Sequence, residues 1–409
     1  MQLDFGHDGC MKHFPPKLKP MKHWLDAERV NAYSAALLFI VGVPVALFAW
    51  EGWGLRGQPL GFDFVTFWTA SRLTLDGMPL QAYSFEALLQ AQHSALPRMT
   101  GSGPWFYPPT FLLVVFPLAL LPCAFSFLLF ISITGTIFVK FLRRILPMRE
   151  SLLPILAFPG LWLNGVYGQN GFVTATLAGC ALVFLEKRPV LAGACIGMLS
   201  IKPHLAILFP IALICARMWI PFVSAAITAA LLAGVSMLVF GTDSLYEFLS
   251  HLQQANGIMS TDSLVQEQAA SVFTALRMVS VPTTLAYAIQ LCVALAATLA
   301  MAWIWLNSRS LELRALVFVA ATFLSNPFIY NYDAVWLGVP IALYISFALR
   351  NGWLRGEREI LLFAWLYPLI GNASASLFHV SLGPLAFLAL MFLAIRRAVH
   401  HSPHTTAIQ

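Results

Sequence analysis

The sequence predicts an all-α protein that crosses a membrane many times, and three observations support this fold class. Only 10% of the 409 residues are charged and 59% are hydrophobic, whereas soluble globular chains carry about 25% charged residues. The mean hydropathy is +0.76. Apolar runs that suit membrane helices recur along the whole chain. The net charge of +6 therefore reports membrane topology and not a nucleic-acid surface.

The order of polar and apolar segments predicts three parts. Residues 1–32 are polar and basic, and we expect them to form a cytoplasmic tail. They lack the short apolar core and the small-residue cleavage site of a signal peptide, so the apolar run that follows should remain as a membrane anchor. The transmembrane domain should then cover residues 33–397, with a second cytoplasmic tail at 398–409.

Thirteen apolar runs alternate with clusters of lysine and arginine, and such clusters gather on the cytoplasmic side. All of these basic clusters fall on the cytoplasmic side only if one of the apolar runs before Lys140 does not cross the membrane. Residues 107–122 read YPPTFLLVVFPLALLP, and prolines end or kink helices. We predict that this segment dips into the outer leaflet, which leaves about twelve crossings in the inner (plasma) membrane with both termini inside.

Two long connections, 51–108 and 241–281, fall on the outer side, and long loops beside a rigid core often carry function. The first contains GFDFVTFWTASRLTLDG at 61–77. Its helical spacing predicts an amphipathic helix from Phe64 that lies on the membrane interface. Asp63 would cap this helix, act as a general base at the membrane surface, or do both. A second short helix is expected from Ser84 to about His93.

The segment LAGACIGMLSIKPHLAILFP, 191–210, combines a GxxxG pattern with a lysine. The pattern predicts close helix packing. The apolar run before Lys202 reaches only ~18 Å of a ~30 Å hydrocarbon core, so Lys202 and His204 should lie below the outer surface on a proline-broken hairpin that lines a cavity. A lipid phosphate is the anion that Lys202 would bind; the alternatives are snorkelling of the lysine and a structural role for His204.

Other polar residues cluster at the outer ends of the apolar runs. Amides and hydroxyls match the hydrogen-bonding groups of sugars, whereas the simpler alternatives are a turn or helix cap at Asn170 and Asp333 and a headgroup contact at Arg277. Arg277 would join the phosphate site. We expect six further residues to contact sugar or acceptor: Tyr107, Gln169, Asn170, Gln268, Tyr332 and Asp333.

Several motifs of soluble enzymes are absent from the sequence. It contains no P-loop, no Rossmann glycine fingerprint, no HExxH and no CxxC. We therefore expect no cofactor and no metal site, and we expect the six cysteines to be unpaired. An enzyme with this sequence would draw its activated donor from the membrane.

Five segments in this order resemble glycosyltransferase family 87, over roughly residues 30–400. They are DFVTFWTASRLTLDGMPLQAY (63–83), YPPTFLLVVFPLALLP (107–122), GQNGFVTATL (168–177), LAGACIGMLSIKPHLAIL (191–208) and NPFIYNYD (326–333). The resemblance, nearest to the bacterial branch, implies a GT-C fold, a polyprenyl-phosphate sugar as donor and a cavity open on the outer side. It also implies that Asp63 is the general base.

These expectations combine into a cell-envelope hexosyltransferase or pentosyltransferase. Asp63 would deprotonate a lipid or glycan acceptor, the sugar would be transferred with inversion, and Lys202 with His204 or Arg277 would stabilise the leaving lipid phosphate. The alternative is a transporter or flippase of lipid-linked sugars, which would share the cavity and Lys202. A non-catalytic scaffold would leave a buried Lys202 unexplained.

Overall fold

The computed structural model describes residues 23–51, 59–99, 103–261 and 267–400. Most of these residues are helical, and an isolated β-bridge joins Ala269 to Tyr330. Seven segments in the described ranges are long and apolar enough to cross a membrane. They are α1 (Ala27–Glu51), α5 (Cys123–Ile145), α11 (Trp219–Phe240), α15 (Thr283–Asn307), η7 with α17 (Asn331–Leu337, Gly338–Asn351), α18 (Glu357–Phe378) and α19 (Gly383–His400).

These spans confirm an all-α, multi-pass membrane protein, whereas the count of about twelve crossings stays a prediction. The expected tails at 1–32 and 398–409 lie largely outside the described residues. Four shorter apolar segments lie among the spans. They comprise α4 (Pro109–Val115) with η3 (Leu118–Leu120), α8 (Gly171–Phe184), α9 (Pro189–Met198) with η5 (Leu199–Ile201), and η6 (Pro203–Leu205) with α10 (Phe209–Cys215).

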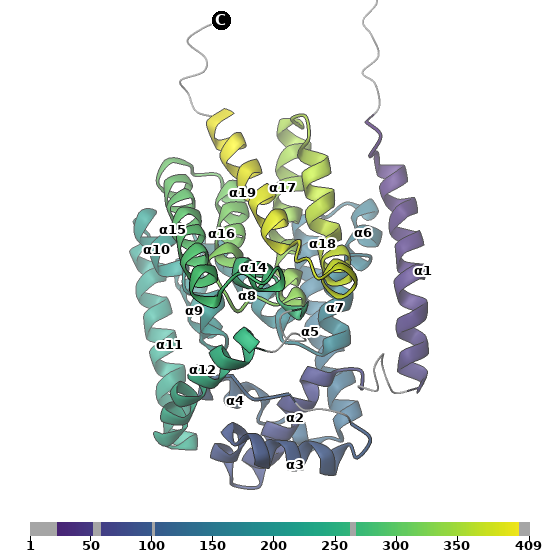
Figure 1. The fold of residues 1–409 in the computed structure, drawn as a ribbon. Helices are drawn as coiled ribbons and strands as arrows, with labels where there is room; N and C mark the ends of the chain where they lie inside the picture. The colour runs from purple at the N-terminus through teal and green to yellow at the C-terminus, as the bar shows by residue number, and fades with distance from the viewer. Residues whose placement is uncertain (1–22, 52–58, 100–102, 262–266, 401–409) are drawn as a thin grey trace, which may run out of the picture.

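The centre of the bundle is α16 (Leu311–Ser325), which is buried over its whole length from Leu313 to Leu324. It packs against α15, α17 and α19. A helix that is apolar on every side has no face for water and is buried in the core. The opposite case is α1, which leaves most of its apolar side chains exposed and stands beside the bundle (Figure 1).

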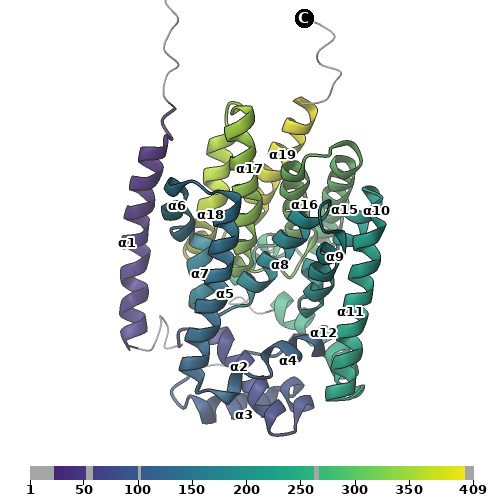
Figure 2. The ribbon, with the colours of Figure 1, turned by 180° about the vertical axis from the view of Figure 1, so that it is seen from behind.

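A layer of shorter helices covers the end of the bundle opposite the C-terminus, and the view from behind shows the same arrangement (Figures 1 and 2). Its members are α2 (Phe62–Leu75), η2 (Pro79–Tyr83), α3 (Phe85–Ala95), α4, η3 and α12 (Asp243–Thr261). Ser84 caps α3 by accepting a hydrogen bond from the N–H of Ala87, as its sequence predicts. The connecting elements are η4 (Arg149–Ser151), α6 (Leu152–Leu156), α7 (Pro159–Tyr167) and α14 (Val272–Met278).

The structure corrects two expectations about the helix that carries Asp63. The helix α2 begins at Phe62, after Gly61 with φ 75°, so Asp63 lies inside the first turn and is not the cap. The helix is also not amphipathic with one open face, because nine of its fourteen residues are buried and α3, α4 and η2 pack against it; its place at a membrane interface stays a prediction. Phe67 is 1% exposed, and the indole N–H of Trp68 donates to the carbonyl of Leu121 at 2.8 Å. These aromatic residues therefore hold this layer of short helices together.

The two proline-rich segments are broken helices. In 107–122 the helix α4 has seven residues, so the predicted dipping helix is shorter than expected. In 190–216 the chain breaks between α9 and α10 into two 3-10 turns, and Lys202 lies between these turns. A Cβ atom on Gly193 would contact the carbonyl of Pro221 and the side chain of Ser224 in α11. The GxxxG prediction of close packing is therefore confirmed for α9 against α11.

Candidate functional site

Asp63 and Gln169 form one half of the candidate site. Gln169 Nε2 donates to Asp63 Oδ2 at 2.8 Å. Gln169 Oε1 accepts two hydrogen bonds, from the hydroxyl of Tyr107 at 3.0 Å and from the N–H of Asn170 at 3.2 Å. Two donors on Oε1 fix the orientation of the amide, so its NH₂ group must face the carboxylate. One oxygen of Asp63 is thereby held, and Oδ1 has no such bond to a described residue.

A glycine turn places Gln169 beside Asp63. The turn follows α7 at Gly168, which has φ 73°, and the side chain of Asn164 closes it by donating to the carbonyl of Gln169 at 3.1 Å. A Cβ atom on Gly168 would lie 2.6 Å from Cβ of Phe64 and 2.9 Å from Cα of Gly61. Only glycine allows this approach. The turn therefore packs directly on the start of α2 and sets Gln169 against Asp63.

Lys202 and Asp333 form the other half. Their Nζ and Oδ1 atoms are 2.5 Å apart, and the two residues are 3% and 0% exposed. Lys202 therefore does not snorkel to the interface; it is a buried cation with a buried partner. The second oxygen of Asp333 accepts a hydrogen bond from the N–H of Tyr330 at 3.3 Å at the start of η7. Asp333 thus caps a helical turn and balances a charge at the same time.

The two halves interact electrostatically. Asp63 lies in α2, outside the seven candidate spans, and burial among its neighbours raises its pKa to about 6, against the lowering effect of the Gln169 hydrogen bond and the Lys202 charge. The charge of Asp333 raises this pKa further. Asp63 nevertheless keeps part of its surface exposed. A carboxylate that is reachable and titrates near neutrality can accept a proton from a substrate.

Aromatic rings lie beside these two halves. The rings of Tyr330 and Tyr332 stack at 5.2 Å with an interplanar angle of 9°, and Tyr167 lies 5.7 Å from Tyr332. Lys202 Nζ lies 5.1 Å from the centroid of the Tyr332 ring. Burial and the negative charge of Asp63 both raise the pKa of Tyr107, so this hydroxyl stays a hydrogen-bond donor at neutral pH.

The structure brings six of the predicted residues together, namely Asp63, Tyr107, Gln169, Lys202, Tyr332 and Asp333. Asn170 is adjacent and fully buried, and neither polar atom of its side chain has a partner among the described residues. Buried amides rarely lack partners, so this side chain is a candidate contact for a substrate.

Three other predicted residues are less closely tied to this group. His204 has a buried Nε2 atom without a partner among the described residues, and the positive charge of Lys202 acts on its ring. Gln268 precedes Ala269, which forms the β-bridge to Tyr330. Arg277 lies in the last turn of α14 and donates to the carbonyl of Val281 at 2.7 Å.

Two residues of this region were not singled out from the sequence, Tyr167 and Asn164. Both belong to the same NGVYGQNG segment as Gln169, in the last turns of α7. The signal that could have found them is their place directly before the glycine turn that carries Gln169. No group of three or more histidine, cysteine, aspartate or glutamate residues that could hold a metal occurs within the described ranges.

Comparison with protein families identifies a match over more than half of the chain. The family model described as glycosyltransferase family 87 matches residues 105–327, which are 223 of the 409 residues. The match includes Tyr107, Gln169 and Lys202, whereas Asp63 and Asp333 lie outside it. Neither the curated proteins nor the solved structures provide a match.

Proposed function

The chain belongs to glycosyltransferase family 87, and from this membership we propose that it transfers a hexose or pentose from a polyprenyl-phosphate donor to a lipid or glycan acceptor. Membership makes the protein a membrane glycosyltransferase and favours the enzyme over the transporter. The donor, the acceptor and the residue roles below are our proposal. We place the reaction in a GT-C-type fold, on the extracytoplasmic side of the plasma membrane, with both tails in the cytoplasm.

The observation that carries this proposal is the position of Asp63. Its carboxylate is held by Gln169 at 2.8 Å, is partly exposed, and lies within electrostatic reach of the buried Lys202–Asp333 pair. A base beside a cation is the arrangement that displacement of a lipid phosphate from an anomeric carbon requires, since a proton must leave the acceptor while negative charge builds on the phosphate.

In the proposed step, the acceptor hydroxyl gives its proton to Oδ1 of Asp63. The acceptor oxygen forms a bond to the anomeric carbon from the side opposite the leaving group, and the bond from that carbon to the phosphate oxygen breaks. The phosphate leaves with the electron pair, so the anomeric configuration inverts. The Asp63 carboxyl later releases its proton to water, and the enzyme needs no metal or cofactor in this scheme.

Lys202 would stabilise the departing phosphate. An ammonium group has three donors, and the structure shows one directed at Asp333. The remaining donors are the ones we assign to phosphate oxygens, with Asp333 fixing the position of Nζ. His204 and Arg277 are weaker candidates for the same anion. Tyr107, Gln169, Asn170, Gln268, Tyr332 and Asp333 would orient sugar and acceptor.

The donor class can be tested with the purified protein in lipid vesicles. Labelled polyprenyl-phosphate hexoses and pentoses would be offered with an extract of cell-envelope lipids and glycans as acceptor, in parallel with labelled nucleotide sugars. Our proposal expects a new labelled product from at least one polyprenyl-phosphate sugar and none from nucleotide sugars. Transfer from nucleotide sugars alone would contradict it.

A further inference from the structure

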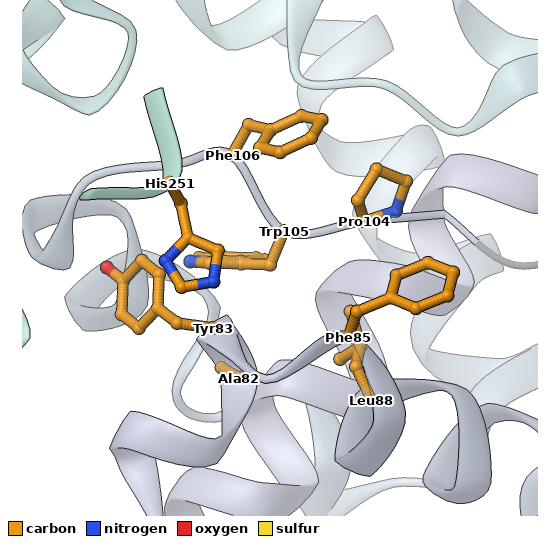
Figure 3. Close-up of a pocket in the computed structure, with 8 residues that line it drawn as sticks. All are labelled: Ala82, Tyr83, Phe85, Leu88, Pro104, Trp105, Phe106 and His251. Atoms are coloured by element: carbon orange, nitrogen blue, oxygen red, sulfur yellow. The ribbon is translucent and has the colours of Figure 1, made fainter. Parts of the chain in front are cut away.

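An aromatic cavity lies in the layer of α2, η2, α3, α4, η3 and α12, beside the candidate site but separate from it. It has a volume of about 270 Å³ and is lined by residues of η2, α3, the 104–106 segment and α12. Figure 3 shows His251 of α12 reaching over Trp105 toward Tyr83, with Phe85 and Phe106 on the other side of the group. Small-molecule sites are apolar, aromatic pockets with few polar groups, usually of ~300 Å³ or more, so this cavity suits a single small ring.

The cavity offers a polar group for a ligand with hydroxyl groups. Nδ1 of His251 contacts the carbonyl of Glu247 at 2.8 Å, so Nδ1 carries the proton and Nε2 of the neutral ring is an acceptor. The Nε1 atom of Trp105 is buried near the phenol of Tyr83 and does not open to the cavity, so Trp105 contributes the apolar part of its ring. An imidazole acceptor among aromatic faces matches a sugar ring, which has polar edges and C–H faces.

The cavity is connected to Asp63 through one short segment. Tyr83 donates its hydroxyl to the carbonyl of Tyr107 at 3.0 Å, and the rings of Trp105 and Tyr107 are 5.2 Å apart. The hydroxyl of Tyr107 in turn donates to Gln169, which holds Asp63. A molecule in the cavity is therefore separated from Asp63 by Tyr107 and Gln169. It lies on the side of Asp63 where η2 and α3 are, and not on the side of Lys202.

We propose that this cavity binds a sugar ring of the acceptor, which makes the acceptor a saccharide or a glycolipid. This inference rests on the proposed function, since it names the substrate class of the same site. The membrane-borne donor would approach from the buried Lys202 side, and the acceptor sugar would stack on Phe85 and Phe106 with a hydroxyl on His251. Its next hydroxyl-bearing unit would extend toward Asp63.

The test measures binding of a panel of labelled mono- and disaccharides to the full-length protein in vesicles. Phe85 is 54% exposed, so F85A should fold normally, and H251Q keeps a polar side chain of similar size. The controls are exposed residues of the same helices, Q90A in α3 and Y246A in α12. We expect at least one saccharide to bind the wild type and both controls, with affinity reduced about tenfold or more in F85A and H251Q.

The outcomes separate this inference from the proposed function. Absence of saccharide binding to the wild type, or equal binding to all variants, would overturn the cavity assignment. Displacement of the saccharide by an alkane thiol without a sugar, or by the polyprenyl-phosphate donor, would also overturn it, since the cavity would then hold a lipid chain or the donor. The D63N variant should still bind the saccharide; if it also kept transfer activity, the base assignment would fail while the cavity assignment stood.

Discussion

At the scale of single residues, the site depends on how neighbours fix each polar group. Gln169 is the clearest case. Its carbonyl oxygen takes two donors, so its NH₂ group faces Asp63, and a carboxylate that accepts one fixed hydrogen bond keeps its other oxygen for a substrate. The same logic applies to Asp333, whose two oxygens serve Lys202 and the N–H of Tyr330.

The pH dependence of transfer should report the state of Asp63. Its pKa is about 6, raised by burial and by Asp333 and lowered by Gln169 and Lys202. A general base works only when deprotonated, so kcat/KM should fall about tenfold per pH unit below pH 6 and level off above it. A profile that stays flat down to about pH 4, the ordinary value for aspartate, would exclude Asp63 as the base; steady-state kinetics on vesicles provides the measurement.

The ion pair of Lys202 should matter for folding as well as for transfer. K202M would leave the carboxylate of Asp333 buried without its partner, which costs about 3–5 kcal/mol. The double variant K202M/D333N removes both charges, so thermal unfolding in detergent should return most of the lost stability, while transfer stays lost in both. A double variant no more stable than K202M would show that the pair does not carry this energy.

At the scale of elements, hydropathy predicted the fold class because a membrane helix is recognisable from the apolar composition of its own segment. The environment of α2 could not be predicted in this way. Its aromatic spacing looks amphipathic, but α3 and α4, which cover it, come from other parts of the chain. Its start at Phe62 depends on Gly61, which packs on the Gly168 turn, a contact that no local pattern contains.

The candidate site shows the same limit. The sequence alone singled out Lys202, Gln169 and Asp63. Polar side chains within or next to apolar membrane segments cost free energy, so their presence there indicates a function. The pairing of Lys202 with Asp333 spans 131 residues of sequence. The sequence suited Asp333 equally well to a helix cap, and in the structure it both caps a helical turn and pairs with Lys202. The pairing could not be predicted, because tertiary packing decides which distant groups meet.

The contact between α9 and α11 yields a prediction about helix packing. G193A would place a methyl group against the carbonyl of Pro221 and the side chain of Ser224, and overpacking of this kind costs about 1–3 kcal/mol. The thermal midpoint in detergent should fall accordingly. The matched control is G234A in α11, which has open space around it and should be neutral or slightly stabilising; equal midpoints for both variants would contradict the close packing.

At the scale of the whole molecule, the proposal requires that the two ends of the helical bundle lie on opposite sides of the membrane. The layer of short helices with Asp63 lies at the end opposite the C-terminus (Figure 1). In a cysteine-depleted background, D76C at the end of α2 should react with a membrane-impermeant maleimide on intact cells. R355C, at the other end before α18, should react only after permeabilisation. Both positions are exposed, so the reverse pattern would place the site in the cytoplasm.

The central claim is that Asp63 is the base of a glycosyl transfer, and replacing its carboxylate is the most direct measurement. D63N keeps the size of the side chain and its contact with Gln169, and D76N, an exposed aspartate paired with Arg72 on the same helix, is the control. In vesicles with a labelled polyprenyl-phosphate sugar and acceptor extract, our account predicts that D63N folds normally and loses about 10²–10⁴-fold of the transfer rate, while D76N stays near wild type. Transfer by D63N at the rate of D76N would contradict the account.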